Sequence, residues 1–168
     1  MLKRRMIALL YLIYRCGGKI VSRKKLQKLV FLTEYYLDNS KVSTSKLTND
    51  LNYNFIIYYY GPFSWELYAD VDMLVDKGYL IEKYQHGDIY DEFIKGYYIY
   101  ELTENGIKKA LNYKGDDFER INRIINLFKD KNADELEKIC YKLLNLNEKL
   151  KDKVFGYSTE EYLKKYLK

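Results

Sequence analysis

Apolar residues recur at helical spacing in the first 37 residues, in two stretches that glycine and serine delimit. The first stretch, 2–15, is apolar nearly all round and ends at Gly17-Gly18, where glycine supplies the left-handed conformation that ends helices. A short extended segment, 19–21, follows, and Ser22 is a suitable N-cap for a second helix over 23–37. The buried stripe of the second helix is predicted at Leu26, Leu29, Val30, Thr33 and Leu37. Its opposite face carries Lys24, Gln27, Lys28, Phe31 and Tyr35.

The next stretch is polar and is followed by short apolar elements. Residues 38–54 are rich in Ser, Thr, Asn, Asp and Lys, which predicts a loop with one short helical turn at 45–50. The β-branched and aromatic run 55–60 predicts a strand that Gly61-Pro62 breaks. A third helix over 64–77 is then expected, with Ser64 as its cap and Gly78 at its end. Its core stripe is predicted at Leu67, Val71, Leu74 and Val75.

Two further strands and several helices complete the pattern. The runs 79–84 and 95–102 predict two strands joined by a long polar loop, which is the shape of a wing. Thr103 is expected to cap a fourth helix over 104–112.

The final third is predicted to be helical. Helical spacing continues over 116–129 and 133–151, and Ser158 opens a capping box before a short terminal helix. The apolar faces of the two longer helices either cover the body of the protein or mediate dimerisation, and a homodimer is expected.

Together these elements predict an α+β fold that is mostly α. The chain has 168 residues, enough for one sizeable core and an appendage. The order helix, short strand, helix, helix and two-stranded wing predicts a winged helix-turn-helix domain over 1–113. A C-terminal helical extension is expected over 114–168.

Two stretches carry a more specific resemblance. KLQKLVFL at 25–32 and FIIYYYGPFSWEL at 55–67 resemble the YwgA-like proteins and the related Panacea (SocA-like) domain. The resemblance covers about residues 1–112 and does not extend to the final third. It implies a winged-helix fold and an antitoxin, adaptor or regulatory role without catalysis, and it supplies no catalytic residues. A shared fold is in any case weak evidence for a shared activity.

Charge is distributed unevenly along the chain, whose net charge is +5. The segment 1–33 holds nine basic residues and no acid, whereas 50–92 holds nine acids against two lysines. A phosphate backbone favours nearby cations, so the acids within 64–77 argue against insertion of that helix into a DNA groove.

The leading hypothesis is therefore a regulatory protein, of the transcription-regulator type, that contacts the backbone of double-stranded DNA through its first two helices. The predicted contacts are Arg4, Arg5, Lys19, Arg23, Lys24, Lys25, Gln27 and Lys28. The alternative interpretation of these cations is a solvated helix face.

The competing hypothesis is an antitoxin-like or adaptor-like module that binds another protein through helix 64–77. Its predicted contacts are Trp65, Glu66, Tyr68 and Asp72, because aromatic residues beside charges are typical of interaction surfaces. Trp65 and Tyr68 lie one helical turn apart, so packing against the wing or the tail is the alternative for both.

Catalytic chemistry finds little support in the sequence. His86 with Asp88, Asp91 and Glu92 is the nearest approach to a catalytic or metal-binding group, and it lacks regular ligand spacing. We therefore expect no enzyme activity, no metal and no cofactor.

The two cysteines lie far apart without a Cys-x-x-Cys motif, which indicates reduced thiols and a cytoplasmic location. The apolar run 6–14 is too short to cross a membrane, so no membrane partner is expected.

Overall fold

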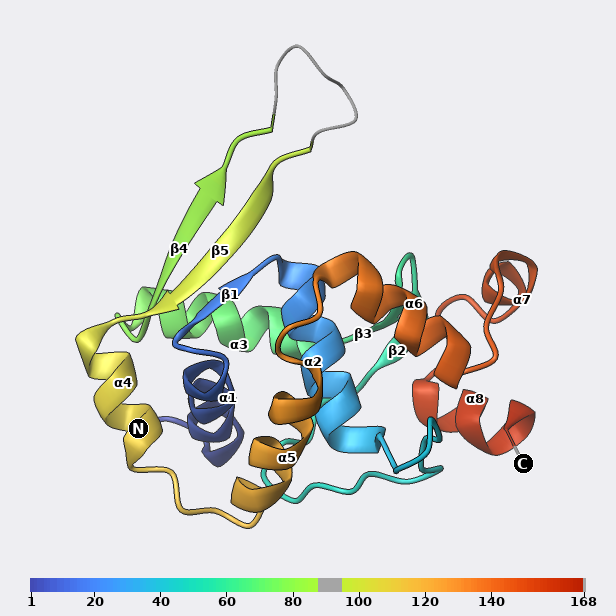
Figure 1. Ribbon diagram of the computed structural model, residues 1–168, viewed down its shortest axis with the longest axis horizontal. Coiled ribbons are helices and arrows are strands. Elements are labelled where there is room, and N and C mark those ends of the chain that lie inside the picture. The colour runs from blue at the N-terminus through green and yellow to red at the C-terminus, as the bar shows by residue number, and fades with distance from the viewer. Residues whose placement is uncertain (88–94, 168) are drawn as a thin grey trace.

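The computed structural model describes residues 1–87 and 95–167, which form an α+β fold that is about half helical. The helices of this part of the chain are α1 (Arg4–Arg15), α2 (Arg23–Tyr35), α3 (Trp65–Asp76), α4 (Glu104–Leu111), α5 (Phe118–Phe128), α6 (Ala133–Leu143), α7 (Glu148–Lys153) and α8 (Thr159–Tyr166) (Figure 1). Its strands are β1 (Lys19–Val21), β2 (Ile56–Tyr58), β3 (Gly61–Phe63), β4 (Leu80–Gln85) and β5 (Tyr97–Leu102).

The strands form two small antiparallel sheets. One has the order β1-β5-β4, with Ile20 opposite Tyr100 and Tyr84 opposite Tyr98. The β4–β5 hairpin projects from the body of the molecule (Figure 1). The predicted strands at 79–84 and 95–102 are thus present.

The other sheet is the β2–β3 hairpin, and it corrects the prediction of a single strand over 55–60. Tyr59 and Tyr60 form its turn, and Gly61, at φ 91°, opens β3 rather than breaking a strand. The left-handed conformation of Gly61 lets a short turn close between antiparallel strands.

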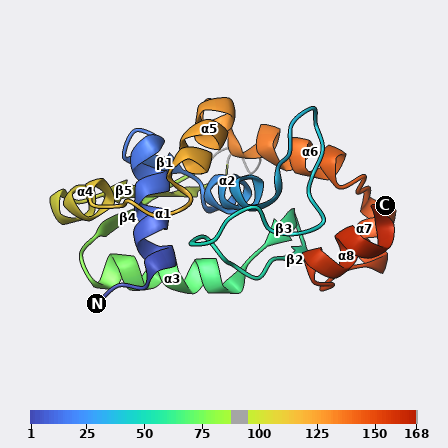
Figure 2. The same ribbon diagram turned by 90° about the horizontal axis from the view of Figure 1, so that it is seen from below.

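The helices are arranged in layers around α2. Viewed from below, α3 lies along one side, α5 and α6 along the other, and α1 and α2 between them (Figure 2). α2 packs against α5, α6 and β3, and α1 packs against α4 and α5. The predicted outer face of the second helix is therefore buried: Gln27, Lys28, Phe31 and Tyr35 lie in the interior because β3 and α6 cover them.

The segment after α2 also differs from the prediction. α2 ends at Tyr35, because Tyr36 is extended and pairs with Val42 in an isolated bridge. The expected helical turn at 45–50 is absent from this described segment. The backbone N–H groups of residues 49–51 donate instead to the carboxylate of Asp117, at 2.7–2.8 Å. A side chain thus takes the donors that a helical turn needs.

The C-terminal third packs on the body of the molecule. The helix predicted over 133–151 is divided into α6 and α7, because Asn145 is left-handed at φ 50° and Asn147 caps α7. The predicted cap Ser158 is confirmed, since it accepts a hydrogen bond from the Glu161 N–H. One hydrophobic core contains residues from α1 to α8. The domain division at 113 and the homodimer stay predictions.

The segment before α8 adds to the edge of β2. The Ile57 N–H donates to the Tyr157 carbonyl at 2.9 Å, and the Gly156 N–H donates to the Ile57 carbonyl at 2.7 Å. The Thr159 N–H donates to the Phe55 carbonyl at 2.9 Å. This pairing places Phe155 beside the β2–β3 hairpin.

Within 1–87 and 95–167, no helix has the length and apolar character to cross a membrane.

Candidate protein-binding surface

Six aromatic rings form a continuous cluster around the β2–β3 hairpin, and we call it the aromatic surface. Its members are Tyr58, Tyr59, Phe63, Trp65, Tyr68 and Phe155. The rings of Phe63 and Trp65 are 4.9 Å apart between centroids, and those of Trp65 and Tyr68 are 6.0 Å apart. Phe155 joins the cluster from the C-terminal segment, at 5.1 Å from both Tyr58 and Tyr59.

Much of this cluster is open to solvent. Trp65 is 56% exposed and Tyr59 is 60% exposed. Ser64 holds Trp65 at the first position of α3: its side chain accepts from the Leu67 N–H, and it is itself fixed by Gln27. Contiguous exposed aromatic area of this kind is characteristic of protein-binding surfaces, where Trp and Tyr contribute most of the binding energy.

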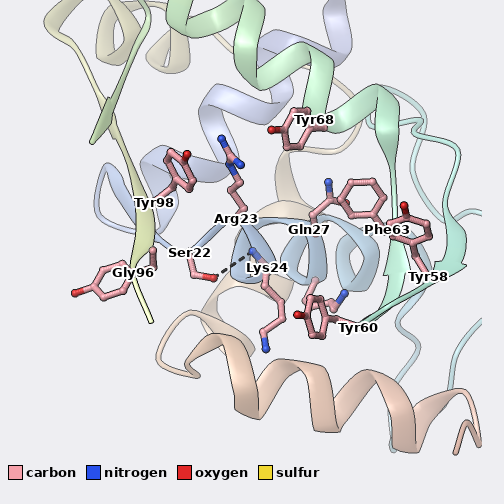
Figure 3. Close-up of a pocket in the computed structure, with 12 residues that line it drawn as sticks. Ser22, Arg23, Lys24, Gln27, Tyr58, Tyr60, Phe63, Tyr68, Gly96 and Tyr98 are labelled. Atoms are coloured by element: carbon pink, nitrogen blue, oxygen red, sulfur yellow. Dashed lines mark hydrogen bonds between the residues drawn. The ribbon is translucent and has the colours of Figure 1, made fainter. Parts of the chain in front are cut away.

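A pocket of about 290 Å³ adjoins the aromatic surface. The β2–β3 hairpin, α3, the β4–β5 hairpin and the first turns of α2 frame it (Figure 3). It is lined by Ser22, Arg23, Lys24, Gln27, Lys28, Tyr58, Tyr60, Phe63, Tyr68, Gly96, Tyr97 and Tyr98. In the part of the chain that the structure describes, its charged lining residues are all basic, and its walls are mainly aromatic.

Arg23 is held rigidly at this pocket. Its guanidinium lies 3.6 Å from the ring centroid of Tyr98 and 4.9 Å from that of Tyr68. Nε donates to the Tyr100 hydroxyl at 2.7 Å, and Nη2 lies 3.6 Å from a carboxylate oxygen of Glu82. Stacking and these polar contacts together fix the guanidinium plane.

Lys24 leaves α2 in the other direction, toward α6 (Figure 3). Its ammonium lies 2.7 Å from Asp134 and 2.6 Å from Glu137. Burial lowers the pKa of Lys24, but the hydrogen bonds to these two carboxylates outweigh that effect and raise it above its ordinary value. Lys24 also lies 4.9 Å from the ring centroid of Tyr60, at the rim of the pocket.

Gln27 and Lys28 anchor the neighbouring hairpin to α2. The Gln27 amide donates to the Ser64 carbonyl at 2.9 Å and accepts from the Ser64 N–H at 2.8 Å. Lys28 is only 2% exposed, and its ammonium donates to the Pro62 carbonyl at 2.8 Å. Burial lowers the pKa of Lys28 to about 8. Both side chains are therefore structural parts of the interior.

The predicted protein-binding residues fall on both faces of α3. Trp65 and Tyr68 belong to the aromatic surface, and Asp72 is exposed. Glu66 accepts from the Asn54 N–H at 2.8 Å and lies 3.5 Å from the Arg5 guanidinium. The structure thus brings the two aromatic residues together and turns Glu66 toward internal partners.

The predicted nucleic-acid contacts fall into two groups with internal partners. Arg4 pairs with Asp50 at 2.7 Å, and Arg5 pairs with Asp70 at 2.8 Å. The hydrogen bond to Asp70 raises the pKa of Arg5. The second group lies on α2: Arg23, Lys24, Gln27 and Lys28 line the pocket. Lys25 lies outside it and donates to the Lys129 carbonyl at 2.6 Å. Lys19, on β1, is exposed. Gln27 and Lys28 are buried and line only the pocket, so neither side chain can contact the backbone of DNA.

The remaining predicted groups are separate from this region. His86 is exposed near the tip of the β4–β5 hairpin, and Asp88, Asp91 and Glu92 lie outside the described residues. Cys16 and Cys140 are free thiols, as expected.

Sequence reasoning missed Tyr59, Tyr60 and Phe155 as surface residues. The run of three tyrosines before Gly61-Pro62 was the available signal, since a two-residue turn exposes its central side chains. For Phe155 no local signal exists, because only the pairing of 156–159 with β2 places it there.

Comparison with known proteins identifies one family. The model of the family described as Antitoxin SocA-like, Panacea domain, matches residues 26–144, more than half of the chain. The match confirms the resemblance inferred from 25–32 and 55–67. It also corrects its extent, because it includes α5 and α6. No curated protein and no solved structure matches the chain.

Proposed function

Because the chain belongs to the Antitoxin SocA-like, Panacea domain family, we propose that it is an antitoxin-like protein that binds a toxin protein and blocks its activity. The aromatic surface is the proposed contact. The family match favours this protein-binding hypothesis over that of a nucleic-acid-associated regulator.

The exposure of Trp65 is the observation that carries the proposal. A tryptophan that is 56% exposed beside three other aromatic rings keeps a large apolar area in contact with water. Covering that area with a partner removes this cost, and a tryptophan at the centre of an interface commonly contributes 2 kcal/mol or more, about thirtyfold in affinity.

The ion pairs of the basic segment weaken the case for DNA. Arg4 and Arg5 pair with Asp50 and Asp70, and Lys24 pairs with Asp134 and Glu137. A cation that already has a carboxylate partner gains little from a phosphate, because the existing pair must be broken or screened.

We also infer that α1 to β5 form a winged-helix unit adapted to protein binding. The order of α1, β1, α2, α3 and the β4–β5 hairpin supports this inference, as does the pairing of β1 with β5. Under this interpretation α3, which corresponds to the helix that DNA-binding winged-helix proteins insert into the groove, presents Trp65 and Tyr68 to a protein.

The test is capture of partners from the chain's own host, followed by expression of each captured protein alone. A toxin partner is expected to stop growth alone and to be neutralised by co-expression of this chain. Trp65→Ala should abolish neutralisation and weaken binding at least tenfold in a calorimetric titration.

Leu111→Ala is the matched control. Leu111 is 55% exposed, like Trp65, but lies on α4 at the other end of the molecule (Figure 1). This variant should neutralise the toxin as the native protein does. Capture of no toxic protein, or equal effects of the two substitutions, would contradict the proposal. Circular dichroism of both variants shows whether a loss of binding reflects unfolding.

A further inference from the structure

The pocket beside the aromatic surface has the chemistry of an anion-recognising anchor. We propose that it receives a carboxylate side chain, Asp or Glu, carried on a protruding segment of the partner protein. This inference rests on the proposed function, because it assigns the chemistry that the partner must present at that surface.

Charge is the first argument. Arg23, Lys24 and Lys28 line the pocket, and within 1–87 and 95–167 no acidic residue lines it. The first turn of α2, which opens into the pocket, also contains no acid. The positive end of the helix dipole therefore adds to the charge of the side chains.

The carboxylates of Asp134 and Glu137 already pair with Lys24. The unused donors of the pocket therefore belong to Arg23 and Lys28. Arg23 is 3.6 Å from Glu82, which is a long contact for an ion pair, and its guanidinium has five N–H donors. Among the described residues, Lys28 has a single hydrogen-bond acceptor, Pro62, for its three donors. Burial lowers the pKa of Lys28 because its ammonium has lost water. A carboxylate that reaches this ammonium would be attracted more strongly than it would be in water.

Shape is the second argument, and it favours a side chain over a free nucleotide or metabolite. The volume of about 290 Å³ lies at the lower limit of pockets that enclose small molecules. The pocket shares Tyr58, Phe63 and Tyr68 with the aromatic surface. A protein that covers the aromatic surface must therefore extend over the mouth of the pocket.

The aromatic walls suit the stem of an acidic residue. Tyr58, Phe63 and Tyr68 supply apolar area for methylene groups, while Arg23 supplies the polar contact (Figure 3). A planar guanidinium that is already stacked binds a carboxylate with little further loss of entropy.

The test uses two neighbouring turn residues and a change of charge alone. Tyr60, 57% exposed, lines the pocket beside Lys24, whereas Tyr59, 60% exposed, does not line it and lies beside Lys151. Each tyrosine is replaced by Gln and, separately, by Glu. The two replacements have nearly the same shape, so their difference in affinity for the captured partner isolates the added carboxylate.

Tyr60→Glu should bind the partner at least tenfold more weakly than Tyr60→Gln, because the new carboxylate at the rim of the pocket repels the incoming one. The difference between Tyr59→Glu and Tyr59→Gln should be smaller, because Tyr59 belongs to the aromatic surface but does not line the pocket. Neutralising one Asp or Glu of the partner should then remove the difference between Tyr60→Glu and Tyr60→Gln, which identifies the residue in the pocket.

Three results would overturn the inference while leaving the proposed function intact. In the first, the Glu and Gln variants of Tyr60 bind the partner equally. In the second, the difference in affinity between Glu and Gln is the same at Tyr59 as at Tyr60, which would indicate a general charge effect. Saturable binding of inorganic phosphate to the free protein, without a difference at Tyr60, would assign a site for free anions. A captured partner that is not toxic would refute the proposed function, yet the same titrations would still test the pocket.

Discussion

The helices α2 and α3 both carry charged residues along their length, yet they occupy opposite environments. Every residue of α2 from Leu26 to Tyr35 is buried. α3 buries only Leu67, Asp70, Val71 and Leu74 and leaves its outer face open. The difference follows from position, because α2 lies between two layers whereas α3 lies at one side (Figure 2).

This position decides what a charged side chain does. On α2 the charges of Lys28 and Glu34 must find partners inside the protein, since an unpaired buried charge is costly. On α3 only the carboxylate of Asp70 is buried. The Arg5 guanidinium and the Tyr53 hydroxyl each donate a hydrogen bond to it at 2.8 Å. Asp72 and Asp76 remain in solvent.

The comparison also shows why the charge of a segment is a poor guide to its surface. The basic segment 1–33 and the acidic segment 50–92 partly neutralise each other through Arg4–Asp50, Arg5–Asp70 and Arg23–Glu82. What remains most distinctive on the outside near α3 is aromatic rather than charged.

The largest effect is expected for Lys28→Glu. A carboxylate would replace the ammonium that donates to the Pro62 carbonyl, and two acceptors would face each other in the interior. We expect a loss of about 4 kcal/mol in the free energy of unfolding, measured by urea denaturation. Lys77→Glu, at the exposed C-cap of α3, is the control and should cost no more than about 1 kcal/mol, because a carboxylate at a helix C-terminus is only mildly unfavourable. Similar losses for both would refute the contrast between the helices.

Asp70→Ala tests the one buried acid of α3. Asp70 is 5% exposed, and its removal leaves the Arg5 guanidinium and the Tyr53 hydroxyl without their acceptor. The expected loss is about 3 kcal/mol in the same urea experiment. Asp76→Ala, on the open side of the same helix, should cost less than about 0.5 kcal/mol. A stable Asp70→Ala protein would mean that Arg5 finds another partner.

Much of the secondary structure could be predicted because it depends on neighbouring residues. Ser22, Ser64, Thr103 and Ser158 each cap the helix that was expected after them. Gly78 adopts the left-handed conformation, at φ 80°, that ends α3. Such signals are local and need no knowledge of the fold.

The errors share a different physical cause, which is contact between distant segments. The helical turn expected at 45–50 is replaced by hydrogen bonds to Asp117, some 67 residues away in the chain. Lys28 looked like a surface cation because its acceptor, Pro62, is 34 residues away. Periodicity cannot report partners at such separations.

The same distinction applies to the candidate surface. Trp65 and Tyr68 could be predicted from the aromatic and charged composition of one helix. For Tyr59 and Tyr60 the run of three tyrosines before Gly61-Pro62 was the available signal, and it was missed. Phe155 could not be predicted, because its place depends on the pairing of 156–159 with β2.

Glu34, the buried acid of α2, gives a dependence on pH. Burial raises its pKa from 4.5 to about 7, despite the ammonium of Lys46 at 3.2 Å. Between these two values the folded protein keeps a proton that the unfolded chain has released, so stability falls as the pH rises. We expect a loss of about 2 to 3 kcal/mol across that interval.

The control for this dependence is Glu34→Gln, which keeps an acceptor for the Tyr53 N–H and cannot titrate. Urea denaturation of both proteins over the same pH series separates Glu34 from the other titrating groups. The free energy of unfolding of the native protein minus that of the variant should therefore decrease from pH 4.5 to 7. If the stabilities of the two proteins changed with pH in the same way, the pKa of Glu34 would not be raised in the folded protein.

The smallest effect is expected for Asp72→Asn on the open face of α3. Asp72 is exposed, and no ion pair or hydrogen bond of its side chain is present within 1–87 and 95–167. Its replacement should change the free energy of unfolding by less than about 0.5 kcal/mol. Thermal unfolding, compared with the native protein at one concentration, checks this. A loss above about 1 kcal/mol would give Asp72 a structural role, and α3 would then resemble α2, with its outer face needed for the fold.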